Sequence, residues 1–436
     1  MERYESYKDS GVQWLGKIPS HWESVPFKSV FTLGKGLSIT KENLIENGVN
    51  VISYGQIHSK QNKFSYVIPE LYRFVNESYL QTNPQSLVKK EDFIFADTSE
   101  DVEGSGNFVR IDNSVNTFAG YHTIIARNSK TEFGHFLSYL LQSKLWKVQI
   151  WVQVHGIKVF SITRDILNNT KIILPPLSEQ QSIVSFLDSK CSKIDEWIEK
   201  KQKEVELLGE LKQRLIADAV TRGLNPHVKM KATNIPWLKE IPEHWENKRL
   251  AAMFTDDIET NKDFQYKRAF KFNYGCLVPK NEIGDPEEYR AVYVKYSIVN
   301  TGDILINGLN LNYDFISQRV ACAPSDGIIT SAYVVCRPRP NVNYDYYTYL
   351  FKAMDSIELF HGMGTGIRLT LAFKELKKQM LPVPPLEEQK QIVAHITDKT
   401  SKIDKLIANI TKEIDCIKEY KQRLISDVVT GQIKVC

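Results

Sequence analysis

The sequence predicts an α+β protein with two globular domains, each followed by a long helix. The two helices are expected to form an antiparallel coiled coil with pseudo-two-fold symmetry. The main observation is an internal repeat, since residues 175–221 match residues 384–430 without a gap at 24 of 47 positions. A shorter motif precedes each copy, IPSHWE at 18–23 and IPEHWE at 241–246. Repeats of this length determine the architecture of a chain.

The chain length indicates several domains, because 436 residues are too many for one ordinary hydrophobic core. The repeat places the boundaries. The first globular domain is expected at 1–174 and the first helix at 175–223. The second globular domain is expected at 224–383 and the second helix at 384–436.

Each copy of the repeat is predicted to be one long helix. Ser178 with Gln181 is typical of a capping box, and Gly223 and Gly431 are typical C-terminal stops. Apolar residues recur by threes and fours over about five heptads, the pattern of a coiled-coil seam. The seam residues are Val184, Leu187, Ile194, Ile198, Val205, Leu208 and Leu215 in the first copy, and Val393, Ile396, Ile403, Ile407, Ile410, Ile414, Ile417, Leu424 and Val428 in the second. Neither helix can bury such a stripe alone, so each is the simplest partner of the other.

Each segment ahead of a helix is predicted to be a compact α+β domain. Strand-like runs occur at 92–95, 121–126, 303–306 and 333–336, and helical stretches at 133–146 and 344–359. The two segments align only in outline, at Tyr54-Gly55 with Tyr274-Gly275, Asp92 with Asp303, and Gly156-Ile157-Lys158 with Gly366-Ile367-Arg368. One framework with different loops predicts that the two domains hold different ligands of one kind.

Composition excludes several classes of protein. No apolar run is long enough to cross a bilayer, and the first residues lack the apolar core of a secretion signal, so a cytoplasmic protein is expected. The six cysteines show no spacing typical of metal ligands and are expected to be buried free thiols. The net charge of +4 permits nucleic-acid binding through local patches, without itself arguing for it.

Several motifs together give the chain a family resemblance. They are YKDSGVQWLGKIPSHW at 7–22 with a partial echo at 234–246, LPPLSEQQ at 174–181, VPPLEEQK at 383–390, and KQRLI at 212–216 and 421–425. With these motifs in this order, the chain resembles the specificity subunit of a type I restriction–modification system over nearly its whole length.

The resemblance implies a function and a set of partners. Each globular domain is expected to be a target-recognition domain that reads one half of a split, asymmetric site in double-stranded DNA. The helices would set the gap between the halves and dock two modification subunits, methyltransferases that use S-adenosylmethionine. Two restriction subunits, motor-nucleases that use ATP and Mg²⁺, would join them. The chain itself is expected to be no enzyme and to hold no cofactor or metal.

The residues agree with a non-catalytic role. No Gly-x4-Gly-Lys-Ser/Thr phosphate loop is present in the sequence, which argues against ATP use by this chain. A methyltransferase would carry Asn or Asp before its Pro-Pro pair, whereas the pairs here follow Leu174 and Val383.

Candidate DNA contacts are the polar and basic loop residues of the globular halves. Such side chains read base edges in the major groove and hold phosphates. In the first half they are Lys35, Ser53, Tyr54, Gln56, His58, Lys60, Thr98, Ser99, Ser105, Asn107 and Lys158; in the second, Lys267, Arg268, Lys271, Asn273, Lys280, Asn307, Asn310, Asn312, Arg319 and Arg368. A solvated loop surface is the competing interpretation of each residue, because loops are polar in all proteins.

Three other functions stay open at this point. A coiled-coil scaffold that binds only proteins would explain the helices but not the diverged loops. A specificity subunit of a methylation-only or type II-like system would share every motif. A self-contained nuclease or methyltransferase is disfavoured by the missing motifs.

Overall fold

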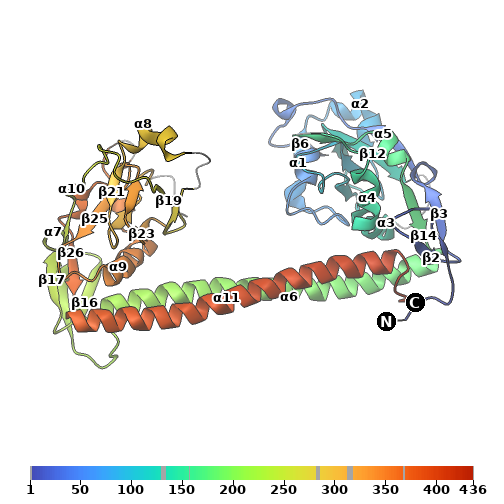
Figure 1. Ribbon diagram of the computed structural model, residues 1–436. Helices are drawn as coiled ribbons and strands as arrows, with labels where there is room; N and C mark the ends of the chain where they lie inside the picture. The colour runs from blue at the N-terminus through green and yellow to red at the C-terminus, as the bar shows by residue number, and fades with distance from the viewer. Residues whose placement is uncertain are drawn as a thin grey trace. The chain divides into compact units, whose positions relative to one another are not determined.

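The computed structural model describes residues 2–128, 134–156, 158–280, 285–311, 318–366 and 369–435. The chain divides into two compact units. Unit 1 comprises Met1–Lys201 with Lys412–Cys436, and unit 2 comprises Gln202–Thr411. Each unit therefore holds one globular part and a portion of each long helix (Figure 1). The predicted fold class, two α+β domains each followed by a long helix, is confirmed.

The two long helices are α6 (Leu177–Arg222) and α11 (Leu386–Val429). Gly223 and Gly431, which follow their ends, adopt positive φ angles of 74° and 72°, as helix stops of this kind require. The predicted capping box is wrong, because α6 begins before Ser178 and leaves that residue inside the first turn.

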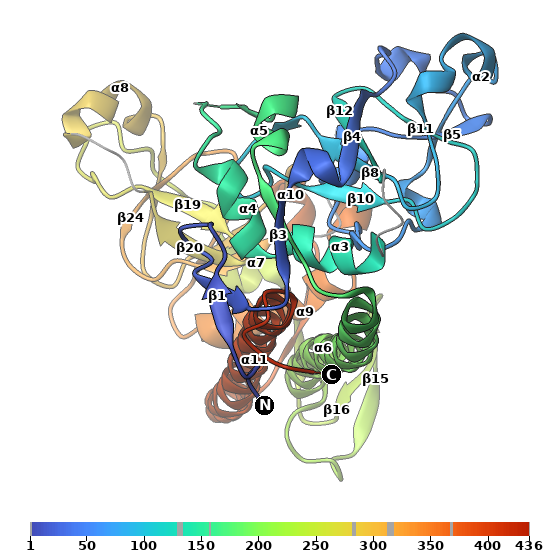
Figure 2. The same ribbon diagram turned by 90° about the vertical axis from the view of Figure 1, so that its right-hand side faces the viewer.

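Ion pairs join the two helices within each unit. In unit 1, Lys421 Nζ donates to Asp195 Oδ1 at 2.6 Å; in unit 2, Lys212 Nζ donates to Asp404 Oδ1 at 2.6 Å. Residues 195 and 404 hold one position of the repeat, and 212 and 421 hold another. The two pairs are therefore equivalent, and the helices run antiparallel in each unit (Figures 1 and 2).

The globular part of unit 1 contains short strands and helices. Its strands are β1 (Tyr7–Asp9), β2 (Lys17–Pro19), β3 (Glu23–Pro26), β4 (Phe31–Lys35), β5 (Val49–Ile52), β6 (Arg73–Val75), β7 (Leu87–Val88), β8 (Phe93–Ala96), β9 (Thr98–Ser99), β10 (Phe108–Arg110), β11 (Thr117–Ala119), β12 (Thr123–Asn128), β13 (Phe160–Ser161) and β14 (Lys171–Leu174). Its helices are α1 (Tyr54–Ile57), α2 (Tyr79–Thr82), α3 (Gly134–Gln142), α4 (Lys144–Trp151) and α5 (Arg164–Asn168). The helix predicted at 133–146 is two helices, because Ser143 Oγ caps α4 by accepting from Trp146 N.

The globular part of unit 2 has fewer strands among its described residues. They are β15 (Met230–Ile235), β16 (Leu238–Pro242), β17 (Glu246–Arg249), β18 (Phe254–Thr255), β19 (Phe270–Asn273), β20 (Cys276–Pro279), β21 (Ser297–Val299), β22 (Ile304–Ile306), β23 (Val320–Cys322), β24 (Gly327–Ile329), β25 (Val334–Pro338) and β26 (Met380–Val383). Its helices are α7 (Leu250–Met253), α8 (Arg290–Tyr293), α9 (Tyr344–Ser356) and α10 (Phe373–Leu376). Helix α9 is the helix predicted at 344–359.

The two units share one β-frame. The antiparallel sheet β10-β8-β12-β4 of unit 1 corresponds to β23-β22-β25-β18 of unit 2. The pairs β3–β14 and β17–β26, which lead into the long helices, also correspond, as do the hairpins β1–β2 and β15–β16. We call these shared strands the frame.

The units differ outside the frame. The antiparallel pair β7–β11 of unit 1 corresponds to β21–β24 of unit 2, but unit 1 extends this pair with β5 and β6, whereas unit 2 has the hairpin β19–β20. The predicted match of Tyr54-Gly55 with Tyr274-Gly275 is wrong, because the first pair begins helix α1 and the second forms the turn of β19–β20.

A repeated tryptophan fixes each globular part to the start of a long helix. Trp22 is fully buried, and its Nε1 donates to Glu179 Oε2 at 3.0 Å in the first turn of α6. In unit 2, Trp245 is fully buried and donates to Glu388 Oε2 of α11 at 3.0 Å. The repeated IPxHWE motif is therefore a core anchor.

The two ends of the chain meet in unit 1 (Figure 2). Glu2 and Lys434 form an antiparallel bridge, and the Tyr7 hydroxyl donates to the Gly431 carbonyl at 3.1 Å. A Cβ on Gly431 would contact Pro19, just as one on Gly223 would contact Trp245. The ends of both long helices thus pack against equivalent hairpins.

Three predictions from the composition concern the cysteines, membrane-spanning helices and metal ligands. The five described cysteines are free, but Cys276 and Cys416 are exposed, so the prediction that all thiols are buried is wrong. Among the described residues, no helix is long and apolar enough to cross a membrane. The described part of the chain also has no group of three or more His, Cys, Asp or Glu side chains placed to hold a metal ion.

Candidate nucleic-acid interface

Many polar residues predicted in the first half gather at one cleft of unit 1. The cleft has a volume of about 810 Å³ and lies between α1, β9 and the loop at 100–107. Its lining includes the predicted residues Tyr54, His58, Thr98, Ser99 and Asn107, together with the carboxylates Glu100, Asp101 and Glu103. Amide and carboxylate groups of this kind can read base edges by hydrogen bonding.

A hydrogen-bond chain orients two residues of the cleft. Lys147 Nζ of α4 donates to Asn107 Oδ1 at 2.5 Å, and Asn107 Nδ2 lies 3.2 Å from His58 Nδ1. His58 Nε2 lies 2.8 Å from the Thr98 carbonyl, which can only accept, so the proton sits on Nε2 and Nδ1 accepts from Asn107. Burial lowers the pKa of Lys147 to about 8. The sequence prediction missed Lys147, because it lies in an apolar helix 40 residues from Asn107.

Three predicted residues of unit 1 have structural roles instead. Ser53 and Ser105 are buried, and the Ser105 hydroxyl donates to the Asp101 carbonyl at 3.4 Å. Gln56 Oε1 accepts from the backbone N of Ser53 at 3.1 Å and completes the N-terminal cap of α1. That cap fixes α1 at the edge of the cleft.

A second cavity of unit 1 is basic. It has a volume of about 420 Å³ and is lined by Lys35 of β4, Arg164 of α5 and Arg127 of β12. Lys35 and Arg164 are exposed, so both cations can reach a phosphate. Arg164 was missed because it lies far from Lys35 in the sequence. The predicted residues Lys60 and Lys158 are also exposed, after α1 and before β13 respectively.

The predicted basic residues of unit 2 gather around the hairpin β19–β20. The four basic residues Lys267, Arg268, Lys271 and Lys280 are exposed, and so is Asn273. Arg268 stacks over Phe270 with its guanidinium 5.4 Å from the ring centroid, and Lys280 Nζ lies 6.0 Å from the centroid of Tyr293. Lys267 Nζ contacts Glu287 Oε1 at 3.0 Å. Most of this positive charge faces solvent.

The loop after β22 contains the remaining candidates. Asn310 is exposed and Asn307 is half-buried. Arg319 is fully buried, and its Nη1 donates to the carbonyls of Asn307 and Leu309 at 2.9 Å each. The Arg319 side chain therefore holds this loop from inside, and its contact with DNA stays a prediction. Asn312 and Arg368 lie outside the described residues.

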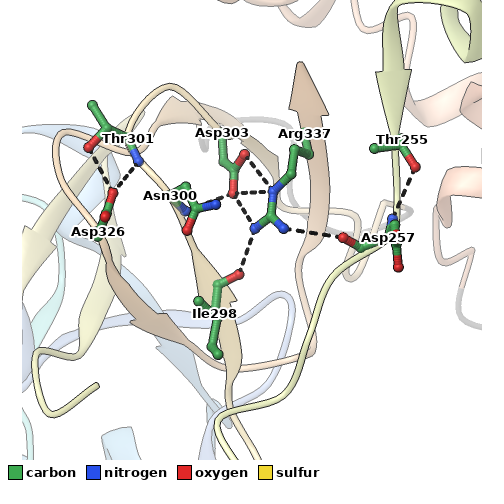
Figure 3. A network of polar contacts seen from close by, with 8 residues as sticks. All are labelled: Thr255, Asp257, Ile298, Asn300, Thr301, Asp303, Asp326 and Arg337. Carbon is green, nitrogen blue, oxygen red and sulfur yellow. Dashed lines mark hydrogen bonds and ion pairs between the residues drawn. The ribbon is translucent and has the colours of Figure 1, made fainter. Parts of the chain in front are cut away.

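A buried ion pair supports the frame in each unit. In unit 2, Arg337 of β25 contacts Asp303 at 2.9 Å and also donates to the Ile298 carbonyl at 3.1 Å (Figure 3). In unit 1, Arg127 of β12 contacts Asp92 at 3.1 Å. Burial raises the pKa of Asp92, although backbone hydrogen bonds and Arg127 oppose that effect. The alignment of Asp92 with Asp303 thus marks equivalent positions, each just before a central strand.

The predicted seam can be located on both helices. Every predicted seam residue of α6 and α11 is buried or half-buried. Exposed apolar residues of the helices lie off the seam, and they include Leu207, Leu211, Leu406 and Tyr420. Leu211 and Tyr420 hold the same position of the repeat.

Comparison with known proteins gives one family for both halves. The sequence model of the Type I restriction modification DNA specificity domain matches residues 19–207 and 242–415. Two curated proteins of Methanocaldococcus jannaschii are similar. The Type I restriction enzyme MjaVIII specificity subunit is 26% identical over 72% of this chain and 74% of its own length. The putative type I restriction enzyme MjaX specificity subunit is 24% identical over 97% of this chain and 96% of its own length.

A solved structure is also similar. It is described as "Structural basis underlying complex assembly and conformational transition of the type I R-M system". One of its chains matches with a TM-score of 0.67 and 18% identity, covering 95% of this chain and 99% of that chain. This likeness shows a common fold. Because the family matches cover most of both units, this chain belongs to the type I restriction modification DNA specificity family.

Proposed function

We propose that this chain is the sequence-specific DNA-recognition subunit of a type I restriction–modification complex. Unit 1 reads one half of an asymmetric, gapped duplex site, and unit 2 reads the other half. The observation that carries the proposal is the contrast between a shared frame and unlike polar surfaces in the two units. A non-catalytic subunit that recognises two different half-sites needs a common scaffold and two different DNA-contacting surfaces.

The two surfaces suit different contacts with DNA. The carboxylates Glu100, Asp101 and Glu103 at the cleft of unit 1 can accept hydrogen bonds from exocyclic amino groups, as Glu and Asp do from cytosine. Arg268 and Lys271 of unit 2 can instead donate to guanine or to phosphates. The half-sites are therefore expected to differ in sequence.

The helices serve as ruler and docking surface in this proposal. Equivalent ion pairs fix their antiparallel register, and the exposed Leu211 and Tyr420 offer equivalent apolar contacts. Two equivalent surfaces suit two modification subunits, which use S-adenosylmethionine. Two restriction subunits, which use ATP and Mg²⁺, complete the complex.

Genome-wide mapping of methylated bases tests the proposal. The strain would carry this chain and its methyltransferase partner, and a matched strain would lack only this chain. We expect a methylated motif with two unlike halves and a fixed gap, present only with the chain. Methylation that is independent of the chain, or that follows one continuous motif, would contradict the proposal.

A mobility-shift experiment separates the DNA reader from a protein-only scaffold. The full chain with its methyltransferase partner should prefer the mapped duplex over a scrambled one, and its affinity should fall steeply with salt. A scaffold would assemble with its partner without changing the choice of duplex.

A deletion in the helices tests whether they set the gap between the half-sites. Deleting one heptad from both helices, at equivalent positions of the repeat, should change the preferred gap or abolish binding. The reason is that the two units must still meet one face of a duplex with about 10.5 base pairs per turn. An unchanged gap with full binding would show that the helices do not set the gap.

A further inference from the structure

The tip of the hairpin β19–β20 exposes a large aromatic side chain. Tyr274 is 81% exposed, more than any other exposed large apolar residue of the described chain. No ring stacking, cation–π contact or side-chain hydrogen bond within the described residues involves it, whereas the ring of Phe272 packs on Tyr333 with centroids 5.2 Å apart. The Tyr274 ring therefore contributes little to the core of unit 2.

The backbone conformation of Tyr274 is also energetically unfavourable. Asn273 pairs with Cys276, so Tyr274 and Gly275 form a two-residue turn in which φ is 45° and 71°. Turns with two positive φ angles favour Asn-Gly, and a bulky side chain in the left-handed region is strained. Gly275 suits its position because its φ of 71° is one that residues with a side chain rarely adopt. No comparable requirement of the turn favours an aromatic residue at 274.

The charge around the tip favours one kind of partner. Residues 264–280 contain four basic residues and no Asp or Glu: Lys267, Arg268, Lys271 and Lys280. Alternation along β19 places Lys271 and Asn273 on the face opposite the buried Phe270. The hairpin therefore presents cations and an amide beside an unpaired aromatic ring, which is complementary to a polyanion with apolar base edges.

We propose that the hairpin β19–β20 enters the major groove of the half-site read by unit 2, and that Tyr274 at its tip contacts base edges and sets specificity there. The major groove admits a two-stranded β-ribbon, and aromatic side chains contact the thymine methyl group. Lys271 and Arg268 lie behind the tip, where a ribbon in the groove meets the phosphates. The inference rests on the proposed function and specifies which residue contacts the bases and in which groove.

The substitution Tyr274→Asn tests the proposal, because Asn suits the left-handed turn and removes only the ring. The full chain with its methyltransferase partner would be titrated with the mapped duplex and with duplexes substituted at each base pair of both halves. We expect affinity for the intact site to fall about tenfold, with discrimination lost at one or two adjacent positions of one half. The other half should be read as before. Tyr274→Phe should retain discrimination.

Two controls keep the result interpretable. The melting temperature of Tyr274→Asn should not fall, since the Asn-Gly turn relieves strain. Tyr66→Asn, at an exposed tyrosine of unit 1, should leave the half-site read by unit 2 unchanged.

The contradicting outcomes are distinct. If Tyr274→Asn discriminates every position as the unaltered chain does, this inference fails while the proposed function stands. If the variant loses assembly with the methyltransferase but keeps its sequence choice, the hairpin binds protein and the inference fails. If the unaltered complex has no preferred two-part site, the proposed function fails, and this inference fails with it.

Discussion

The two units differ most where they are least needed for folding. Both contain the same four-stranded frame sheet, a buried Asp–Arg pair and a tryptophan anchored to a glutamate. Beyond the frame, unit 1 has the paired strands β5 and β6 and an acidic cleft, whereas unit 2 has a basic hairpin with an exposed tip. The comparison teaches that duplication preserved the parts that hold the domain to its helix. The parts proposed to contact DNA diverged.

The buried ion pairs should be the most sensitive part of the shared frame. Arg337→Met leaves the Asp303 carboxylate, whose side chain is 1% exposed, without its partner. The free energy of unfolding of unit 2 should fall by about 3–5 kcal/mol. Denaturation followed by unit-specific proteolysis measures it. Arg127→Met is the matched variant of unit 1, and a loss below about 1 kcal/mol in both would show that the pairs do not support the frame.

The two helix stops should respond unequally. A Cβ on Gly431 would lie 2.3 Å from Pro19 Cδ, whereas the nearest atom to a Cβ on Gly223 is Glu388 Oε1 at 2.9 Å. Both substitutions to Ala should cost about 1 kcal/mol or more because of the positive φ, and Gly431→Ala should cost more. Thermal unfolding measures both. Gly209→Ala is the control, since a Cβ there meets nothing within 4 Å and should stabilise α6 by about 1 kcal/mol. A larger cost at Gly223 would contradict the packing argument.

The interhelical ion pairs should contribute less. A double-mutant cycle with Lys212→Met and Asp404→Asn should give a coupling of about 0.5 kcal/mol, because both groups are partly exposed. The cycle at Lys421 and Asp195 should give a similar value, since the pairs are equivalent in the repeat. Unequal couplings would show that the two ion pairs are not energetically equivalent.

The smallest expected effect is a pH dependence of the stability that the Trp22–Glu179 contact gives to unit 1. Burial acts to raise the pKa of Glu179, but hydrogen bonds from Trp22, His21 and Tyr4 outweigh it and hold that pKa below its usual value. The stabilisation is therefore present above about pH 4.3 and is lost as pH falls through the lower folded pKa. Glu179→Gln should flatten this acid limb in melting experiments. An unchanged limb would remove Glu179 from the anchor's pH response.

The sequence predicted the helices better than the recognition surface. Helical periodicity and the terminal glycines are local signals, and the repeat supplied each of them twice. The break between α3 and α4 at Ser143 was missed, because it depends on a single N-cap, the Ser143 hydroxyl. The mismatch of Tyr54 with Tyr274 arose because the same Tyr-Gly pair suits a helix start and a tight turn.

The site depends on tertiary contacts that a sequence does not show. Arg319 and Ser105 were candidates by residue type, and the sequence does not show that their side chains are buried. Lys147 of α4 and Arg164 of α5 neighbour predicted residues only because the fold brings distant parts of the chain together. Tyr274 was read as part of a shared framework, and its exposure is a property of the hairpin alone.

An exchange of recognition surfaces tests the central claim most directly. Residues 250–379, which lie between β17 and β26 and carry the frame sheet β18-β25-β22-β23 together with the diverged loops, would be replaced by the corresponding segment of a relative with another specificity. Methylated bases would then be mapped in a strain carrying the methyltransferase partner. We expect one half of the motif to change while the other half and the gap stay the same. A change in both halves, or in neither, would contradict the assignment of one half-site to each unit.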